Sequence, residues 1–331
     1  MRLRCLVVNC MASMISIAVS FSASAQSASV DSFPDKPIRI VVPYSPGGIA
    51  DTMARLLASS LHQSLKQTVI VENKPGANTA IGAMAVAKSP ADGYTLLLAT
   101  GGTVVMNPFL YKQLSYDPEK DFTSVAQVSL TPLVMNVKVD SPIKDIKDLV
   151  RLAKKDPGKI SYASQGLGST TQMSMELLQS ATGMTLNHVP YKGSGDSINA
   201  ALSGTVDITV DAIASAMPMI QANKLRPLAV TTDKRSAYLP DTPTLGETVA
   251  PDYSVWVWYG LVAPAGTPPA IVAKLNQEVI SAMKNKSFSE PLEKNGLVIA
   301  TPMTPAEHTA FLQKERKQWK QLIQEKSIRV E

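Results

Sequence analysis

The sequence predicts an α/β fold with two lobes, each a mainly parallel sheet flanked by helices, and a ligand cleft between the lobes. Short β-branched runs alternate with helix-like segments in two successive series, the second beginning near residue 130. Such alternation is typical of parallel sheets covered by helices. Small polar loops follow strands at 43–51, 99–104 and 163–171. Ligands of open α/β sheets bind beyond the carboxyl ends of strands, so these loops predict one shared cleft.

The first strand-turn-helix unit contains the turn Ser45-Pro46-Gly47-Gly48. A β-branched strand at 38–43 precedes it, and apolar residues spaced by three and four predict a helix at 49–65. The first backbone N–H groups of a helix have no partner within it, and they carry the positive end of its dipole. The turn is therefore a candidate anion site, or else a plain βα turn.

The remaining elements follow from the same patterns. A cap residue and a first-turn proline, Ser141-Pro142, open a helix that runs to about residue 156. Crossings between lobes are expected near 127–131 and 254–258, which gives lobe 1 as 26–129 plus 256–331 and lobe 2 as 130–255. Further strands are predicted at 68–71, 94–99, 160–163, 185–189, 206–210, 226–231, 255–262 and 297–300, and further helices at 79–88, 171–181, 196–202, 213–223, 268–285 and 304–326.

Composition indicates a soluble globular protein, because 45% of the 331 residues are hydrophobic and 18% are charged. The formal net charge is +5, and it falls to +3 without Arg2 and Arg4. This small and evenly spread excess argues against nucleic acid as a partner.

Residues 1–25 have the order of a secretory signal peptide. Arg2 and Arg4 precede a largely apolar run, and Ala23-Ser24-Ala25 predicts cleavage after Ala25 and a periplasmic location. The alternative is a membrane anchor, but polar residues dilute the run and it is short for a span. Both cysteines, Cys5 and Cys10, lie inside this segment. The exported chain would then have no disulfide, cysteine-metal site or cysteine nucleophile.

Motifs for catalysis, metals and cofactors are not found. The three histidines are far apart in sequence and form no zinc-binding pattern. Gly166-Leu167-Gly168 lacks the third glycine of a dinucleotide fingerprint, and no phosphate-binding Gly-Lys-Ser/Thr loop occurs. Ser141-Pro142-Ile143-Lys144 matches a Ser-x-x-Lys pattern, but its serine is better explained as a helix cap. The prediction is no catalytic residue, no metal and no cofactor.

The candidate ligand-binding residues lie on the loops that follow strands. Glycines allow close backbone approach and positive φ, and hydroxyls at a helix start can donate to a ligand. Asp51 could complement the helix dipole, or accept hydrogen bonds from loop N–H groups or a ligand donor. Asp211 could cap a helix or border the cleft. The predicted set is Tyr44, Pro46, Gly47, Gly48, Ile49, Ala50, Asp51, Thr100, Gln165, Gly166, Gly168, Ser169, Thr170 and Asp211.

Lys and Arg are absent from the three loops, so an anion there would be held by N–H groups, hydroxyls and helix dipoles. Trp256 and Trp258 alternate on the last long strand and are expected to share one face, chiefly as core or hinge packing.

Several motifs, in order along the chain, resemble the solute receptors of tripartite tricarboxylate transporters, the Bug receptor family. They are Pro46-Gly47-Gly48-x-x-Asp51-x-x-Ala54-Arg55, Asn73-Lys74-Pro75-Gly76-Ala77, Pro90-Ala91-Asp92-Gly93-Tyr94-Thr95, Val189-Pro190-Tyr191-Lys192-Gly193, Leu239-Pro240-Asp241-Thr242-Pro243-Thr244 and Ala263-Pro264-Ala265-Gly266-Thr267-Pro268. The resemblance implies a periplasmic-binding-protein fold of type II that closes on an organic acid. It also implies that loops 45–51 and 164–171 grip a carboxylate from opposite lobes.

The predicted function is therefore a monomeric periplasmic receptor that captures a small organic acid, aromatic acids included, by hinge closure. It would deliver this carboxylate or dicarboxylate to membrane permease subunits. The alternatives are a sensor subunit that presents its ligand to a membrane signalling protein, and a secreted hydrolase or lyase using Asp51 or Asp211 as a base.

Overall fold

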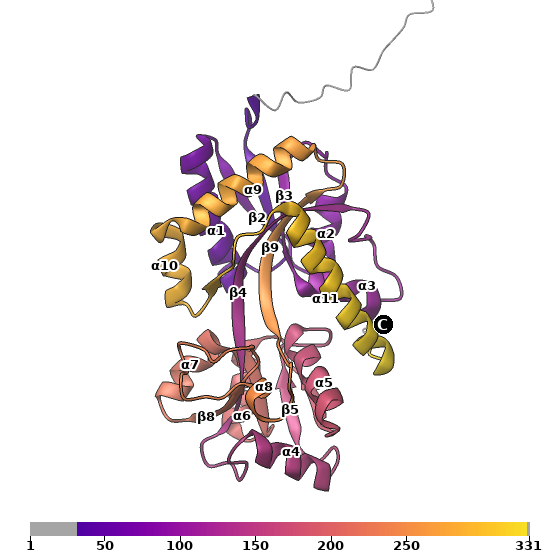
Figure 1. The fold of residues 1–331 in the computed structure, drawn as a ribbon, viewed down its shortest axis with the longest axis vertical. Helices are drawn as coiled ribbons and strands as arrows, with labels where there is room; N and C mark the ends of the chain where they lie inside the picture. The colour runs from indigo at the N-terminus through magenta and orange to yellow at the C-terminus, as the bar shows by residue number, and fades with distance from the viewer. Residues whose placement is uncertain (1–31, 330–331) are drawn as a thin grey trace, which may run out of the picture. The chain divides into compact units, whose positions relative to one another are not determined.

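The computed structural model describes residues 32–329. Every named helix and strand belongs to one compact unit, Pro34–Glu331, in which two lobes are joined by long strands (Figure 1). The predicted signal peptide, residues 1–25, lies outside the described residues. Within residues 32–329, no helix has both the length and the apolar character needed to cross a membrane.

The first lobe contains a mixed sheet in the order β2-β1-β3-β9-β4, with β10 on the other edge of β4. The strand β1 pairs parallel with β2 and β3, whereas β9 pairs antiparallel with β3 and with β4. The strands are β1 (Ile38–Val42), β2 (Val69–Asn73), β3 (Thr95–Thr100), β4 (Phe122–Lys138), β9 (Trp256–Pro264) and β10 (Val298–Ile299).

The second lobe shares β4 with the first. Residues 122–132 of β4 pair with β9, and residues 133–138 pair antiparallel with β7 and β8. The strand β5 pairs parallel with β6 and β7. These strands are β5 (Ser161–Ser164), β6 (Asn187–Pro190), β7 (Ile208–Ala212) and β8 (Leu225–Val230).

Helices cover both sheets because each buries one apolar stripe. In α1, the side chains of Met53, Leu57 and Leu61 recur every four residues and are fully buried, and α1 packs against β2, α9 and α10. The first lobe has α1 (Ile49–Leu65), α2 (Ala80–Ala87), a π-helical segment (Gly102–Met106), α3 (Asn107–Leu110), α9 (Pro269–Lys284), α10 (Lys286–Lys294) and α11 (Pro305–Glu325). The second has α4 (Ile146–Lys155), α5 (Thr170–Thr182), α6 (Ser194–Ser203), α7 (Ile213–Gln221) and α8 (Leu245–Thr248).

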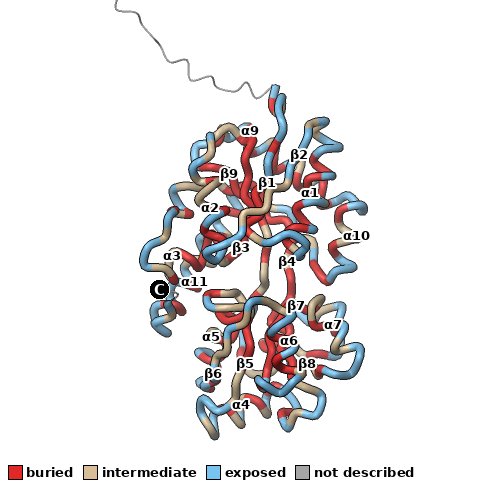
Figure 2. Tube along the Cα trace, turned by 180° about the vertical axis from the view of Figure 1, so that it is seen from behind, coloured by how far each residue is buried: buried red, intermediate tan, exposed pale blue. Residues whose placement is uncertain are grey.

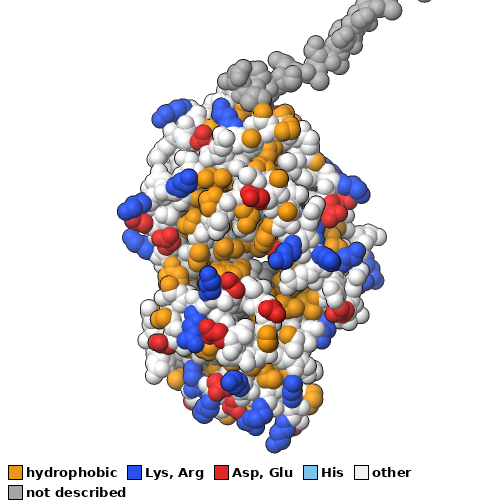
Figure 3. Space-filling model, in the orientation of Figure 1, with side chains coloured by type: hydrophobic (Ala, Val, Ile, Leu, Met, Phe, Trp, Pro, Cys, Tyr) orange, Lys and Arg blue, Asp and Glu red, His pale blue; other side chains and the backbone are white. Residues whose placement is uncertain are grey.

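Buried residues follow the strands of both lobes, and exposed residues lie on the outer sides of the helices (Figure 2). The helix α11 packs so closely on β9 that glycine is required at position 260. A Cβ atom there would lie 2.8 Å from the carbonyl oxygen of Ala126 and 3.1 Å from the ring of His308. On the face shown in Figure 3, acidic and basic side chains are interspersed over both lobes.

The predicted strand and helix positions are confirmed within a few residues for most elements. The strand β1 pairs parallel with β2 and β3, and β5 pairs parallel with β6 and β7, as predicted. Both sheets are nevertheless mixed, because β9 pairs antiparallel with β3 in the first lobe and β4 pairs antiparallel with β7 in the second. The 17-residue strand β4 was not predicted as one strand. The expected start of the helix at Ser141-Pro142 was wrong, because Asp145 caps α4 by accepting a hydrogen bond of 2.8 Å from the N–H of Asp148.

Candidate functional site

The turn between β1 and α1 places free backbone donors at the edge of the first lobe. Gly47 has a φ of +86°, a conformation that favours glycine, whereas Gly48 has an ordinary φ of −82°. Gly48 is the N-cap of α1 and offers no side chain to satisfy the helix start. The N–H groups of Ile49 and Ala50 consequently have no hydrogen-bond partner among the described residues.

Asp51 supports this turn from behind. Its carboxylate is 4% exposed and accepts hydrogen bonds of 3.0 Å from the N–H of Gly47, from Nε of Arg55 and from Nδ2 of Asn73. The hydrogen bond from Arg55, helped by those from Gly47 and Asn73, lowers the pKa of Asp51 to about 2. Asp51 is thus ionised and fully engaged within the protein.

The second loop, between β5 and α5, is ordered by its own hydroxyl groups. Ser169 is the N-cap of α5: its Oγ accepts from the N–H of Gln172 at 3.2 Å and donates to the carbonyl of Gly166 at 2.6 Å. The hydroxyl of Thr171 accepts from the N–H of Gln165 at 3.0 Å. Gly166 and Gly168 adopt φ values of +124° and +73°, which let the loop fold back.

The third loop joins the first through a tyrosine. The hydroxyls of Tyr44 and Thr100 are 2.9 Å apart, and Thr100 is in turn 3.2 Å from the hydroxyl of Thr103. Burial raises the pKa of Tyr44, so its hydroxyl remains protonated and able to donate.

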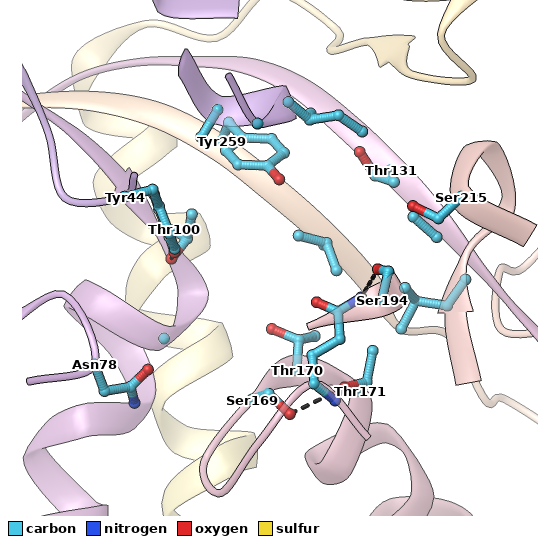
Figure 4. A pocket seen from close by; sticks show the side chains of 18 of the residues that line it. Tyr44, Asn78, Thr100, Thr131, Ser169, Thr170, Thr171, Ser194, Ser215 and Tyr259 are labelled. Carbon is cyan, nitrogen blue, oxygen red and sulfur yellow. Dashed lines mark hydrogen bonds between the residues drawn. The ribbon is translucent and has the colours of Figure 1, made fainter. Parts of the chain in front are cut away.

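A cavity of about 540 Å³ lies between the lobes, where these loops face one another (Figure 4). Residues of both lobes line it, and among the described residues that do so none carries a charge. The lining residues are Tyr44, Gly47, Gly48, Ile49, Ala50, Asn78, Thr100, Gly102, Thr131, Leu133, Gln165, Gly168, Ser169, Thr170, Thr171, Ser194, Ala212, Ser215, Val257 and Tyr259.

The N-termini of four helices reach this cavity. Residues from the first turns of α1, α5, α6 and α7 line it, and α1 comes from the first lobe whereas the other three come from the second. The N-caps of α6 and α7 make no side-chain cap hydrogen bond. Each helix start carries partial positive charge and free N–H groups. The helix starts therefore present partial positive charge and backbone donors to a cavity whose lining side chains are neutral.

Most of the predicted ligand-binding residues line this cavity, and four do not. Asp51 and Asp211 are buried behind it, and Pro46 and Gly166 lie at the turns beside it. Asp211 is fully buried and accepts hydrogen bonds from Nε2 of Gln165 at 3.1 Å and from Oγ of Ser197 at 2.8 Å. Burial raises the pKa of Asp211. Neither aspartate reaches the cavity as a base would need to.

Several lining residues were missed, and an alternation signal could have found two of them. Trp258 packs against His308 and Phe311, as expected for a core residue. Side chains alternate along a strand, so Val257 and Tyr259 point to the opposite face, which is the cavity face. Thr131 carried no such signal; it lies on β4, and its buried hydroxyl has no hydrogen-bond partner among the described residues. Asn78 lies in a loop at a positive φ of 46°.

Metal binding and catalysis find no geometric support in residues 32–329. No group of three histidine, cysteine, aspartate or glutamate side chains there could hold a metal ion. His188 lies 2.6 Å from the hydroxyl of Ser164, but burial lowers its pKa to about 4 and its ring stacks on Tyr162. Neither His188 nor Ser164 lines the cavity.

The family profile described as "Tripartite tricarboxylate transporter family receptor" matches residues 53–328. Solved structures are similar over nearly the whole chain. The periplasmic binding protein BugD is 33% identical with a TM-score of 0.76, covering 90% of this chain and 99% of that one. The predicted two-lobed periplasmic-binding-protein fold is confirmed by this likeness.

Two further relatives were solved with a ligand. Rpa4515 of Rhodopseudomonas palustris, solved with adipate, is 33% identical with a TM-score of 0.78 and covers 88% of this chain and 97% of its own. MatC from the same organism, solved with bound malate, is 31% identical with a TM-score of 0.76. The match covers 88% of this chain and 100% of MatC. Adipate and malate are both dicarboxylates.

Proposed function

Because this chain belongs to the tripartite tricarboxylate transporter receptor family, it is a periplasmic solute receptor, and we propose that its ligand is a small organic acid bound in the cavity between the lobes. The observation that carries the proposal is the convergence of four helix N-termini on a cavity whose lining side chains are uncharged. Backbone N–H groups and helix dipoles stabilise a carboxylate without an arginine or lysine.

The size of the cavity fits this ligand class. Small-molecule sites usually have volumes of about 300–1,000 Å³, and this cavity has about 540 Å³. Apolar side chains of Ile49, Leu133 and Val257 line it beside the polar loops. This mixture suits a short carbon skeleton with one or more carboxylates, and the adipate and malate of the two relatives support the same class.

Binding would stabilise a closed arrangement of the lobes, because a ligand held by both α1 and α5 joins them. We place lobe 1 at residues 26–129 plus 256–331 and lobe 2 at 130–255, so that β4 and the segment entering β9 form the hinge. The mature receptor, cleaved after Ala25, would act as a monomer. In its closed form it would deliver the acid to a membrane permease. The predicted ligand contacts Tyr44, Gly48, Thr100, Ser169 and Thr170 would hold the acid.

A thermal-shift screen of the mature protein tests the ligand class. The panel contains mono-, di- and tricarboxylates, amino acids, aromatic acids and neutral sugars. A ligand at 100 times its dissociation constant adds about 2.7 kcal/mol to the free energy of unfolding. At least one organic acid is expected to raise the melting temperature. A shift with neutral sugars and none with any acid would contradict the proposal.

The variant Gly48→Val tests the site. A Cβ atom on Gly48 would meet only the carbonyl oxygen of Ser45, at 4.0 Å, and its φ of −82° suits valine. The chain should therefore fold normally, while the isopropyl group blocks approach to the N–H groups of α1. We expect affinity for the acid found in the screen to fall at least about tenfold. Ser59→Val, on the exposed side of α1, is the matched control.

A further inference from the structure

Gln165 lines the cavity, and the nitrogen of its side-chain amide is held by two hydrogen bonds within the protein. Its Nε2 atom donates to Oγ of Ser194 at 2.8 Å and to Oδ1 of Asp211 at 3.1 Å. The first of these bonds is the dashed line that reaches Ser194 in Figure 4. An amide nitrogen carries two hydrogens, so both are used within the protein.

Asp211 fixes which way this amide points. The carboxylate is 0% exposed, and its other oxygen accepts from the hydroxyls of Ser197 and Thr209. Burial raises the pKa of Asp211, but the hydrogen bonds from Thr209, Gln165 and Ser197 act against that rise and favour the ionised form. As a carboxylate Asp211 can only accept hydrogen bonds, so the group that faces it is the NH₂ of Gln165. Turning the amide over would set two oxygens against each other in a buried place, at a cost in unpaired polar groups.

The oxygen of Gln165 is consequently the atom left for the ligand. Oε1 accepts no hydrogen bond from any described residue, and it is not among the buried side-chain atoms that lack a partner. Gln165 is half-buried and lines the cavity. Its oxygen is thus an open acceptor in a site otherwise rich in donors.

We propose that Gln165 selects organic acids that carry a hydrogen-bond donor, a hydroxyl or an ammonium group, in addition to a carboxylate. The inference rests on the proposed function, because it assumes that an organic acid occupies this cavity. An acid without a donor would displace water from Oε1 without replacing the lost hydrogen bond, so it would bind more weakly. Asp211 acts as a positioning residue, since it sets the amide orientation without lining the cavity.

Isothermal titration calorimetry with matched ligands tests the selection. One set is malate, aspartate, succinate and methoxysuccinate; a second is lactate, alanine, propionate and 2-methoxypropionate. The O-methyl ethers keep the oxygen of the hydroxy acid but lose the donor. In the set that binds, the hydroxy or amino acid is expected to bind at least about tenfold tighter than both partners without a donor.

Equal affinity for the donor-bearing and donor-free acids would overturn the selection and leave the organic-acid proposal standing. Binding of neutral sugars in place of every acid would overturn both. Comparison of malate with aspartate separates the two sources of the donor, because one offers a hydroxyl and the other an ammonium group.

Two variants locate the effect. Gln165→Leu removes the acceptor, so the donor-bearing and the donor-free acid should bind to this variant with about equal affinity. Asp211→Asn keeps the shape but lets the amide turn over, so the preference should fall while affinity for the donor-free acid stays within about threefold. An unchanged preference in folded Gln165→Leu would overturn the inference. Gln221→Leu, at an exposed glutamine at the end of α7, is the control and should keep the wild-type preference.

Discussion

The hydroxyl of Thr231 donates a hydrogen bond of 2.7 Å to the backbone carbonyl of Val255. The backbone of Thr231 continues the link, because its N–H donates to the carbonyl of Leu133 at 3.0 Å and its carbonyl accepts from the N–H of Val255 at 2.8 Å. Leu133 lies where β4 passes from one lobe to the other, and Val255 directly precedes β9. The two strands that join the lobes are thus tied to each other at one residue.

Thr231→Val should loosen this connection. Thr231 is 1% exposed, and valine keeps its shape while removing the hydroxyl that Val255 uses. The same hydroxyl also accepts a hydrogen bond of 3.3 Å from the N–H of Leu133. We expect the free energy of unfolding to fall by about 1–3 kcal/mol, as for the loss of two buried hydrogen bonds. Urea denaturation measures this fall. Thr301→Val, at an exposed position, should stay within about 0.5 kcal/mol of the wild type; an equal loss in both variants would contradict the prediction.

Asp51→Asn should destabilise the protein at neutral pH but not in acid. The pKa of Asp51 is lowered to about 2 in the folded protein, against about 3.9 in an unfolded chain. Its contribution is therefore complete above pH 4 and is lost as the pH falls from about 4 to 2. We expect a cost of about 1–2 kcal/mol at pH 7.

Urea denaturation at several pH values checks this prediction. The wild type and Asp51→Asn should converge as the pH approaches 2. The matched control is Asp140→Asn, because Asp140 pairs with Lys138 at the surface and is 67% exposed. Such a pair contributes little. A difference between wild type and Asp51→Asn that stays constant from pH 7 to pH 2 would show that the carboxylate charge is not the cause.

Ser169→Ala should weaken both the fold and ligand binding. Ser169 caps α5 and lines the cavity, whereas Thr304 caps α11 through a capping box far from it. Loss of either cap should cost about 1 kcal/mol of stability. Only Ser169→Ala should also reduce the affinity for the acid, by about tenfold, because the hydrogen bond from the Ser169 hydroxyl to the carbonyl of Gly166 orders the cavity loop. Calorimetry on Ser169→Ala and Thr304→Ala separates the two effects; equal affinity in both would remove Ser169 from the site.

His308→Phe should make the protein more resistant to mild acid. The ring of His308 is fully buried, with neither nitrogen hydrogen-bonded within the described residues, and burial lowers its pKa to about 4. An unfolded histidine has a pKa near 6.5 and takes up a proton first, so stability falls as the pH drops from about 6.5 to 4.

Denaturation at pH 7 and pH 4.5 measures the effect. The phenylalanine variant should lose less stability between these two values, by up to about 2–3 kcal/mol. Phenylalanine has a similar ring, which can keep the stacking on Phe311 and the edge contact with Trp258. His62→Phe, at an exposed position on α1, should follow the wild-type curve. The same loss in wild type and His308→Phe would rule out a role for the ring.

Local patterns predicted the elements whose apolar period is simple, such as α1 and α9. The strand β4 was not predicted because it is buried on both faces and runs through two lobes. Its sequence therefore shows no alternation, and Pro132 in its middle usually argues against a central strand. The proline is tolerated where β4 leaves the first sheet, because Pro132 forms the last residue pair of β4 with β9, opposite Trp256.

The cavity loops were predictable because they follow strands directly, as at Gly48 and Ser169. Asn78 and Thr131 could not be placed in the same way. Their approach to the cavity depends on how distant strands are ordered in the sheets, and that order is a property of the tertiary structure.

The helix starts around the cavity have a consequence for how the protein can change over time. The donors at Ile49 and Ala50 belong to the main chain, so replacing side chains leaves them in place as long as the helices form. Neighbouring side chains such as Gln165 can then be exchanged to suit a different acid. After gene duplication, one copy of such a receptor can change its ligand specificity through these side chains while the main-chain donors for a carboxylate are kept.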